Sequence, residues 1–133
     1  MAQTLIQVKD LKKYYNGGDV KALDGVTVDV YKGDVIAVIG PSGGGKSTFL
    51  RSLNLLETPD GGQVLFKGQD ITDKKLNISQ YRQSIGMVFQ HFNVFPHMNV
   101  MKNLTLGPIK LQGRKPEEAE KEAQKMLHVY AEF

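Results

Sequence analysis

An unbroken run of five apolar residues at positions 35–39 leads directly into GPSGGGKST, residues 40–48, where four of nine positions are glycine. A run without polar alternation is typical of a strand covered on both faces, as in a parallel sheet flanked by helices. Four glycines at a strand end indicate that something approaches the main chain more closely than side chains would allow. From Lys46 on, apolar residues three or four positions apart predict a helix. The order strand, glycine loop, helix predicts an α/β fold.

The glycine loop matches a pattern with a known chemistry: glycine, any four residues, glycine, lysine, then serine or threonine. Glycines let successive backbone amides form a concavity for anionic oxygens, and the free amides of the following helix point the same way. Lys46 would bring a cation to the β and γ phosphates, and the Ser47 hydroxyl would hold Mg²⁺. The alternative is a flexible turn without a ligand. We expect a nucleotide triphosphate in a cradle made of Gly40, Ser42, Gly43, Gly44, Gly45, Lys46, Ser47 and Thr48.

Composition narrows the functional classes. The 133 residues suit one domain, and a hydrophobic content of 41% suits one core. The net charge of +3 comes from lysines scattered along the chain, so we expect no nucleic-acid binding. The absence of cysteine excludes disulfides and thiolate metal sites. Polar residues within 84–101 exclude a membrane span there, and the N-terminus lacks a secretion signal, so we expect a cytosolic chain.

Further strands are indicated by β-branched and partly alternating segments. Residues 5–8 and 26–31 predict antiparallel edge strands, with turn residues 16–18 between them. A hairpin is expected within residues 63–71, and residues 85–89 predict a second buried strand.

Two more helices are expected. A short helix includes Tyr81, and a longer one begins at Pro116, because proline suits the first helical position and the acids after it suit the positive end of the dipole. One face of the longer helix is apolar, and we expect it to pack against the rest of the molecule rather than bind a partner. This face consists of Ala119, Ala123, Met126, Leu127 and Tyr130.

The loop GPSGGGKST resembles the Walker A loop of ABC transporter ATPases, in which serine more often fills the position of Gly44. Other blocks that resemble this family follow in the same order, at residues 38–43, 51–57, 86–90 and 92–97. The last block, which runs on to Asn103 and Gly107-Pro108, most closely resembles the importers of polar amino acids, such as the glutamine and arginine systems.

The resemblance implies an incomplete P-loop NTPase core of the RecA-like kind. An antiparallel β-subdomain would comprise residues 1–35 and 63–72. The P-loop core would comprise residues 36–62 and 84–90, and residues 91–133 would begin a helical subdomain.

The resemblance also implies a base-binding residue. Tyr15 matches the family's aromatic residue that stacks on adenine, and such stacking contributes ~1–3 kcal/mol. Tyr14 is an alternative one position away, and Tyr15 could also be a surface tyrosine that packs on a strand. Asn16 stands where the family usually has glycine.

Gln90 matches the family's glutamine that contacts Mg²⁺ and the attacking water. Its amide oxygen can face the metal while its nitrogen donates a hydrogen bond. The resemblance thus implies catalytic roles for Lys46 and Gln90 and makes Ser47 and Gln90 metal ligands. Residues 91–101 resemble the segment that meets the membrane subunit.

Motifs from the family's second half do not occur in these 133 residues. There is no Asp-Glu pair after an apolar run and no Leu-Ser-Gly-Gly-Gln signature, and the Gly61-Gly62-Gln63 fragment reads as a turn. We therefore expect Mg-ATP binding with weak or absent hydrolysis, because no general base is evident. A parallel sheet without its other strands should be marginal, so we also expect aggregation or pairing with another copy or another polypeptide.

The sequence is thus interpreted as the N-terminal portion of the ATP-binding subunit of a polar amino-acid importer. Its implied partners are ATP, membrane-spanning transporter subunits and a second copy, at the inner face of the cell membrane. One alternative is a soluble P-loop kinase or GTPase, which the missing Asn-Lys-x-Asp guanine motif disfavours. The other is a non-enzymatic module that docks on membrane subunits.

Overall fold

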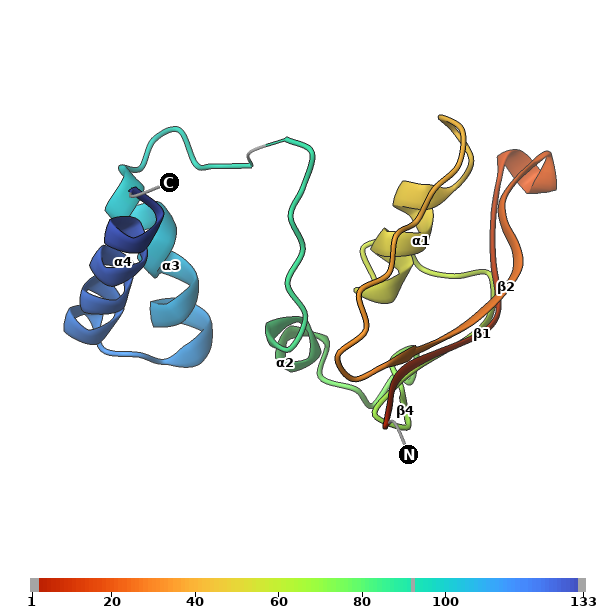
Figure 1. The fold of residues 1–133 in the computed structure, drawn as a ribbon, viewed down its shortest axis with the longest axis horizontal. Coiled ribbons are helices and arrows are strands. Elements are labelled where there is room, and N and C mark those ends of the chain that lie inside the picture. Colours follow the sequence, from red (N-terminus) through yellow and green to blue (C-terminus); the bar gives the residue numbers. More distant parts are fainter. Residues whose placement is uncertain (1–2, 92, 132–133) are drawn as a thin grey trace. The chain divides into compact units, whose positions relative to one another are not determined.

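The computed structural model describes residues 3–91 and 93–131. The chain forms two compact units, one ending at Gly86 and one beginning at Met87 (Figure 1). Among the described residues, the first unit contains a sheet and two α-helices, and the second contains two α-helices.

The first unit is built on a four-stranded antiparallel sheet with the order β2-β1-β3-β4. Strands β1 (Thr4–Tyr15) and β2 (Val20–Tyr31) form a long hairpin through the 3₁₀ turn η1 (Asn16–Gly18). Strands β3 (Gly61–Phe66) and β4 (Gln69–Asp70) form a short one. The antiparallel pairing of the first two strands, the turn and the short hairpin are confirmed, and these two strands are longer than their apolar segments indicate. The predicted edge position is correct for β2 but wrong for residues 5–8, because β1 pairs with both β2 and β3 and lies inside the sheet.

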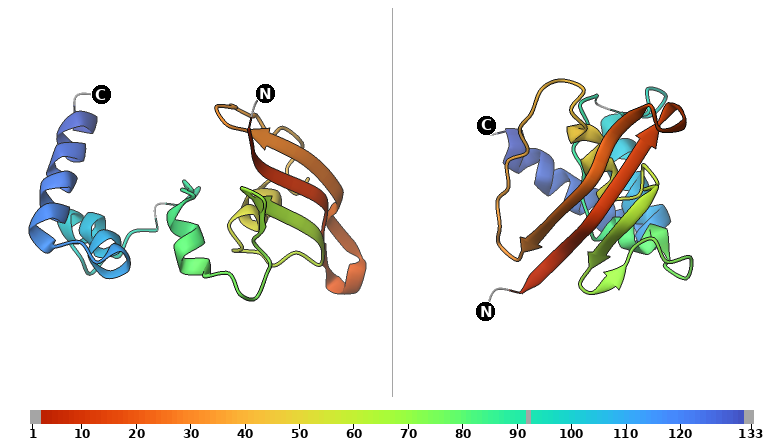
Figure 2. Two further views of the ribbon diagram at one scale, coloured as in Figure 1. Left: turned by 90° about the horizontal axis from the view of Figure 1, so that it is seen from below. Right: turned by 90° about the vertical axis from the view of Figure 1, so that its right-hand side faces the viewer.

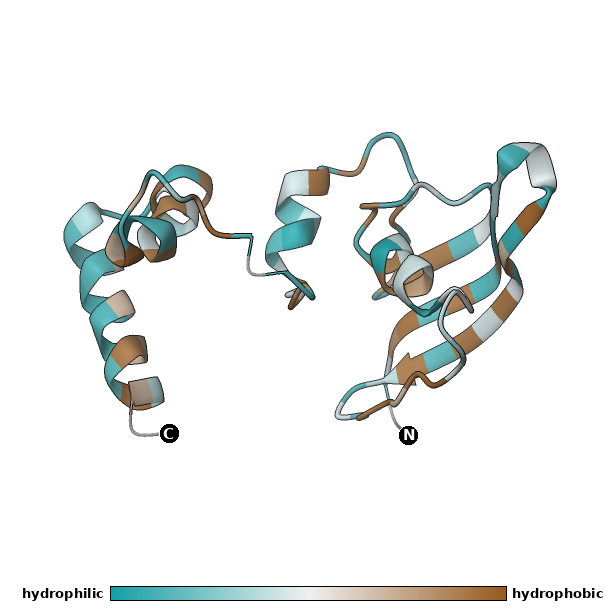
Figure 3. Cartoon of the chain, turned by 90° about the horizontal axis from the view of Figure 1, so that it is seen from above, coloured by the Kyte–Doolittle hydropathy of each residue, from teal (hydrophilic) through white to brown (hydrophobic). Residues whose placement is uncertain are grey.

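One face of this sheet carries the core of the unit. Apolar and polar residues alternate along β1 and β2, which Figure 3 shows as bands of brown and teal. Alternation turns one set of side chains inward, so Ile6 and Val8 of β1 are buried. A register shift between Val8 and Leu11 brings Leu11 to the same face, where it is fully buried together with Val64 of β3. Helix α1 (Lys46–Leu53) packs Phe49 and Leu53 against this core and covers the sheet (Figure 2).

Helix α2 (Ile78–Gln83) is tied to the end of α1 by hydrogen bonds. The hydroxyl of buried Tyr81 donates to the carbonyl oxygen of Leu53. Arg82 donates from Nε to the carbonyl of Asn54 and from Nη2 to that of Leu55, both at 3.0 Å. These bonds satisfy carbonyl groups that the end of a helix leaves without intrahelical partners. The predicted short helix at Tyr81 is confirmed.

The two predicted buried strands at residues 35–39 and 85–89 are wrong for this structure. Both segments are irregular, and Val35, Ile39 and Val88 are 98%, 90% and 99% exposed. A parallel strand needs hydrogen-bonded neighbours, and the sheet found in the described residues is the antiparallel one. An apolar run indicates that a segment favours burial. Whether it forms a strand also depends on a neighbouring strand, which the run itself does not specify.

The second unit is a pair of packed helices, α3 (Val100–Gln112) and α4 (Pro116–Ala131). The predicted start at Pro116 is confirmed. On the apolar face of α4, Ala119 and Ala123 are buried as expected, whereas Met126, Leu127 and Tyr130 are 52%, 41% and 73% exposed. Within the described residues, no helix combines the length and the apolar character that a membrane span requires.

Candidate phosphate-binding loop

The predicted loop lies between β2 and α1, and its last glycine is fixed by packing. Gly45 is the N-cap residue of α1 and has a left-handed backbone with φ of 88°. A Cβ atom there would lie 2.2 Å from the carbonyl oxygen of Ala22 in β2. Both the backbone conformation and the close contact therefore require glycine at this position.

The middle of the loop is a tight turn with an open side. The amide of Gly44 donates to the carbonyl of Pro41 at 3.0 Å. Gly43 also has a left-handed backbone, with φ of 79°, but a Cβ atom there would meet no other group within 4 Å. The loop thus contacts β2 on one side and leaves space for a ligand at Gly43.

Lys46 places its charge inside the loop. Its Nζ donates to the carbonyl oxygens of Gly40 and Pro41 at 2.6 and 2.7 Å. Anionic phosphate oxygens accept stronger, charge-assisted hydrogen bonds than these neutral carbonyls do. The lysine is therefore positioned to exchange its carbonyl contacts for a phosphate bound in the loop.

The first turn of α1 supplies further donors. The first intrahelical bond runs from the amide of Phe49 to the carbonyl of Gly45 at 2.8 Å, and no side chain caps this end of the helix. The amides before Phe49 have no acceptor within the helix, which makes the turn attractive to anions. Ser47 is exposed and Thr48 is partly buried in the same turn. Backbone amides, an ammonium group and hydroxyls together fit a polyphosphate with Mg²⁺.

Tyr15 lies at the same end of the β1–β2 hairpin as this loop. Tyr15 pairs with Val20 of β2. Ala22, whose carbonyl oxygen lies against Gly45, is two residues further along the same strand, about 7 Å from Val20. The structure also distinguishes Tyr15 from the alternative candidate, Tyr14. The Tyr14 hydroxyl donates to Asp24 Oδ1 at 2.8 Å, and this hydrogen bond raises the pKa of Tyr14. Because Tyr14 is held in this way, Tyr15 is the better candidate for a base contact.

Asn16, the position where the family usually has glycine, adopts a left-handed backbone with φ of 54°. Asparagine is one of the few residues that tolerate this conformation. The departure from glycine therefore preserves the turn after Tyr15.

Gln90 lies in the second unit, in an irregular segment with an exposed side chain, whereas the loop belongs to the first unit. Its contact with metal and water stays a prediction.

Sequence reasoning overlooked a role for Lys13 and for Asn103. Lys13 Nζ lies 5.4 Å from the ring centroid of Tyr15. Residues two apart on a strand share a face, so the spacing of Lys13 and Tyr15 could have indicated this contact.

The Asn103 amide nitrogen donates to the carbonyls of Phe95, Met98 and Asn99, and its oxygen accepts from the Phe95 amide at 2.8 Å. The Asn103 side chain thus fixes the segment before α3. No local sequence pattern predicts its hydrogen bonds with Phe95, eight positions away.

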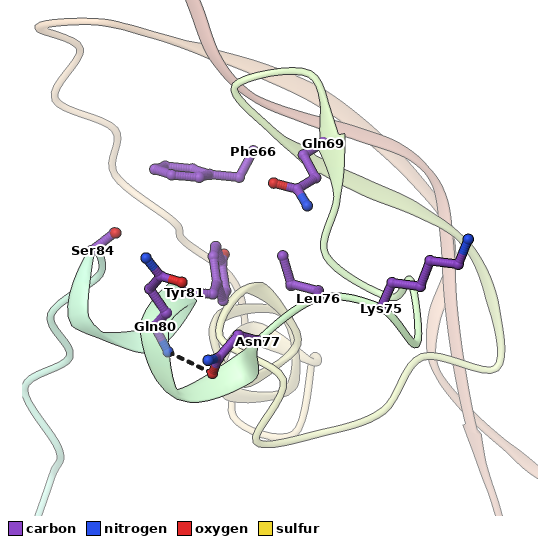
Figure 4. Close-up of a pocket in the computed structure, with 8 residues that line it drawn as sticks. All are labelled: Phe66, Gln69, Lys75, Leu76, Asn77, Gln80, Tyr81 and Ser84. Atoms are coloured by element: carbon purple, nitrogen blue, oxygen red, sulfur yellow. Dashed lines mark hydrogen bonds between the residues drawn. The ribbon is translucent and has the colours of Figure 1, made fainter. Parts of the chain in front are cut away.

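A pocket of about 410 Å³ lies between the β3–β4 hairpin and α2, away from the loop (Figure 4). The rings of Phe66 and Tyr81 meet edge to face there, with centroids 5.4 Å apart. None of the residues that line it is a predicted site residue. The candidate phosphate-binding loop therefore contributes no residue to this pocket.

The loop, the helix behind it and the hairpin beside it define a class of protein. The family model described as "ABC transporter" matches residues 23–132. The chain therefore belongs to the ABC transporter family, and the predicted resemblance is confirmed.

Curated relatives narrow the class. The arginine transport ATP-binding protein ArtM of Bacillus subtilis is 43% identical over 123 residues, which cover 92% of this chain and 50% of ArtM. The glutamine transport ATP-binding protein GlnQ of Geobacillus stearothermophilus is 44% identical over 118 residues, which cover 89% of this chain and 48% of GlnQ. The chain spans about half the length of the curated relatives it matches.

Solved structures confirm the fold class. A dimeric, post-hydrolysis state of the cassette MJ0796 bound to ADP and Pi is 30% identical, with a TM-score of 0.82 over 93% of this chain and 56% of that one. The cbiO1 protein of Clostridium perfringens is 28% identical, with a TM-score of 0.76 over 95% of this chain and 50% of that one. The predicted α/β fold of a P-loop ATPase cassette is confirmed, and this chain matches about half of each cassette.

Proposed function

We propose that this chain binds Mg-ATP in the loop of residues 40–48, as part of the ATPase subunit of an importer for polar amino acids. The observation that carries the proposal is the placement of Lys46 Nζ inside a glycine-lined loop at an uncapped helix N-terminus. Membership in the ABC transporter family supports a nucleotide as the anion. Relatives named for arginine and glutamine transport support polar amino acids as the transported class.

Each predicted residue has a proposed part in binding. Lys46 and the amides of residues 42–48 hold the phosphates, and Tyr15 stacks on the adenine. Ser47 and Gln90 hold Mg²⁺, whose charge would neutralise the phosphates and hold them in place. Hydrolysis by these residues alone should be weak or absent, because positioning and charge stabilisation are present without an evident general base.

The proposed partners are membrane-spanning subunits and a second copy of the ATPase subunit. The solved structures of the related cassette MJ0796 are dimeric, which supports the second copy. Residues 91–101 would contact the membrane subunit at the inner face of the cell membrane. Asn103 holds residues 95–99 in a fixed form, which suits a contact surface.

The proposal is tested by calorimetric titration with Mg-ATP and with Mg-tripolyphosphate, which lacks the base. Lys46→Ala removes a charge-assisted contact worth roughly 1.5–3 kcal/mol, so affinity for both ligands should fall about ten- to a hundred-fold. Tyr15→Ala should weaken ATP alone, and Lys74→Ala, which changes an exposed turn lysine, should change neither. Unchanged curves for Lys46→Ala would refute the phosphate site, and a preference for GTP would favour the GTPase alternative.

A further inference from the structure

Lys13 joins two parts of the candidate site that the sequence places far apart. Its side chain is only 15% exposed. Its Nζ donates to the carbonyl oxygen of Thr58 at 2.9 Å and lies 3.9 and 4.0 Å from the carboxylates of Glu57 and Asp60. The same Nζ lies over the ring of Tyr15, at 5.4 Å from its centroid. One partly buried cation therefore contacts both the turn after α1 and the predicted base-binding ring.

The turn that holds Lys13 is itself fixed to β1. Asp60 accepts the Tyr14 amide at 2.7 Å, and its own amide donates to the carbonyl of Lys12 at 2.8 Å. Helix α1 begins at the phosphate loop and ends at Leu53, four residues before Glu57. The helix and the Lys13 contacts thus set a fixed spacing between the phosphate loop and the Tyr15 ring.

We propose that Lys13 is a positioning residue for the purine of the bound nucleotide. Its ammonium group covers one face of the Tyr15 ring at a distance typical of a cation–π contact, so a base can stack only on the opposite face. The carbonyl and the two carboxylates keep the cation in place over the ring. This inference rests on the proposed function, because it assigns a residue that orients the ring for a purine nucleotide.

The experiment compares Mg-ATP with Mg-tripolyphosphate by calorimetry. Lys13→Met keeps the apolar stem and removes the charge, so affinity for ATP should fall about three- to tenfold while affinity for tripolyphosphate stays the same. Lys13→Arg should restore ATP binding, since a guanidinium group can also stack on an aromatic face and bind carboxylates. In a Tyr15→Ala background, Lys13→Met should have no further effect on ATP affinity.

Lys12→Met is the matched control. Lys12 is the adjacent residue on the opposite face of β1, and it pairs with Asp10 at 3.3 Å, so its loss should leave both affinities unchanged. The inference is overturned if Lys13→Met lowers both affinities equally, lowers neither, or still acts when Tyr15 is absent. If the unmodified chain binds neither ligand, the proposed function fails and this inference with it. If the chain binds both and Lys13→Met changes nothing, only this inference fails.

Discussion

Gly45 lies where the candidate phosphate-binding loop contacts β2. It has a left-handed backbone, and a Cβ atom there would lie 2.2 Å from the carbonyl oxygen of Ala22. We predict that Gly45→Ala lowers the free energy of unfolding by more than the ~1–2 kcal/mol that a left-handed alanine costs, because the loop must also move away from β2. Mg-ATP binding should be lost at the same time. Urea unfolding followed by circular dichroism measures the first effect, and calorimetry measures the second.

Gly43→Ala is the matched control for this prediction. Gly43 has a similar left-handed backbone, but a Cβ atom there would meet nothing within 4 Å. Its loss of stability should therefore stay near the backbone cost alone. Equal losses in the two variants would show that the contact with Ala22 carries no weight.

Residue-level chemistry of the site was predictable from the sequence where it depends on neighbours in the chain. The glycine spacing, Lys46 and Ser47 all lie within one short segment, so a local pattern contains them. The contact of Gly45 with Ala22 and the contact of Lys13 with Thr58 join positions 23 and 45 residues apart. Such contacts follow from the fold and leave no local pattern.

Tyr81 anchors α2 to the end of α1 and makes this junction sensitive to alkali. Burial raises the pKa of Tyr81, and its hydroxyl donates to the Leu53 carbonyl. A raised pKa means that the fold favours the neutral phenol. The stabilisation is complete below the unfolded pKa of about 10 and is lost as the pH rises through that value toward the folded pKa.

We therefore predict that the free energy of unfolding falls above about pH 10 and that this fall is smaller in Tyr81→Phe. At neutral pH the same variant should lose about 1 kcal/mol, because the Leu53 carbonyl loses its partner. Tyr14→Phe serves for comparison, since the hydrogen bond to Asp24 raises the pKa of Tyr14. Removing the Tyr14 hydroxyl should also make the fall in the free energy of unfolding at high pH smaller. Urea unfolding at pH 7 to 11 gives both quantities. An equal slope in Tyr81→Phe and the unmodified chain would contradict the assignment.

Among the elements, those with local signals were predicted and those with distant partners were not. The helix at Pro116 has its own start signal, and α1 follows directly from the loop pattern. Helix α3 was missed although Asn99 caps it, with its side chain accepting from the Lys102 amide at 2.8 Å. An interior proline, Pro108, obscures the helical pattern there.

At the scale of the whole molecule, the apolar run before the candidate phosphate-binding loop is where the predicted and the observed fold disagree most. Residues 35–39 carry the pattern of a buried parallel strand, yet Val35 and Ile39 are 98% and 90% exposed. Exposed apolar segments with unpaired backbone groups favour association between chains. Weak stability or association of the isolated chain stays a prediction, and these exposures give it a location.

We predict that the isolated chain associates at micromolar concentration and that Val35→Asp combined with Ile39→Asp shifts it toward the monomer. Both side chains are almost fully exposed, so the substitutions should leave the antiparallel sheet and its circular dichroism unchanged. Val100→Asp is the matched control, because Val100 is 63% exposed and an acid in the first turn of α3 is compatible with the helix dipole. Sedimentation velocity over a tenfold concentration range measures the effect. A monomer at every concentration would contradict the prediction. An equal shift in Val100→Asp would also contradict it, because added negative charge, rather than the loss of apolar contacts at residues 35 and 39, would then explain the effect.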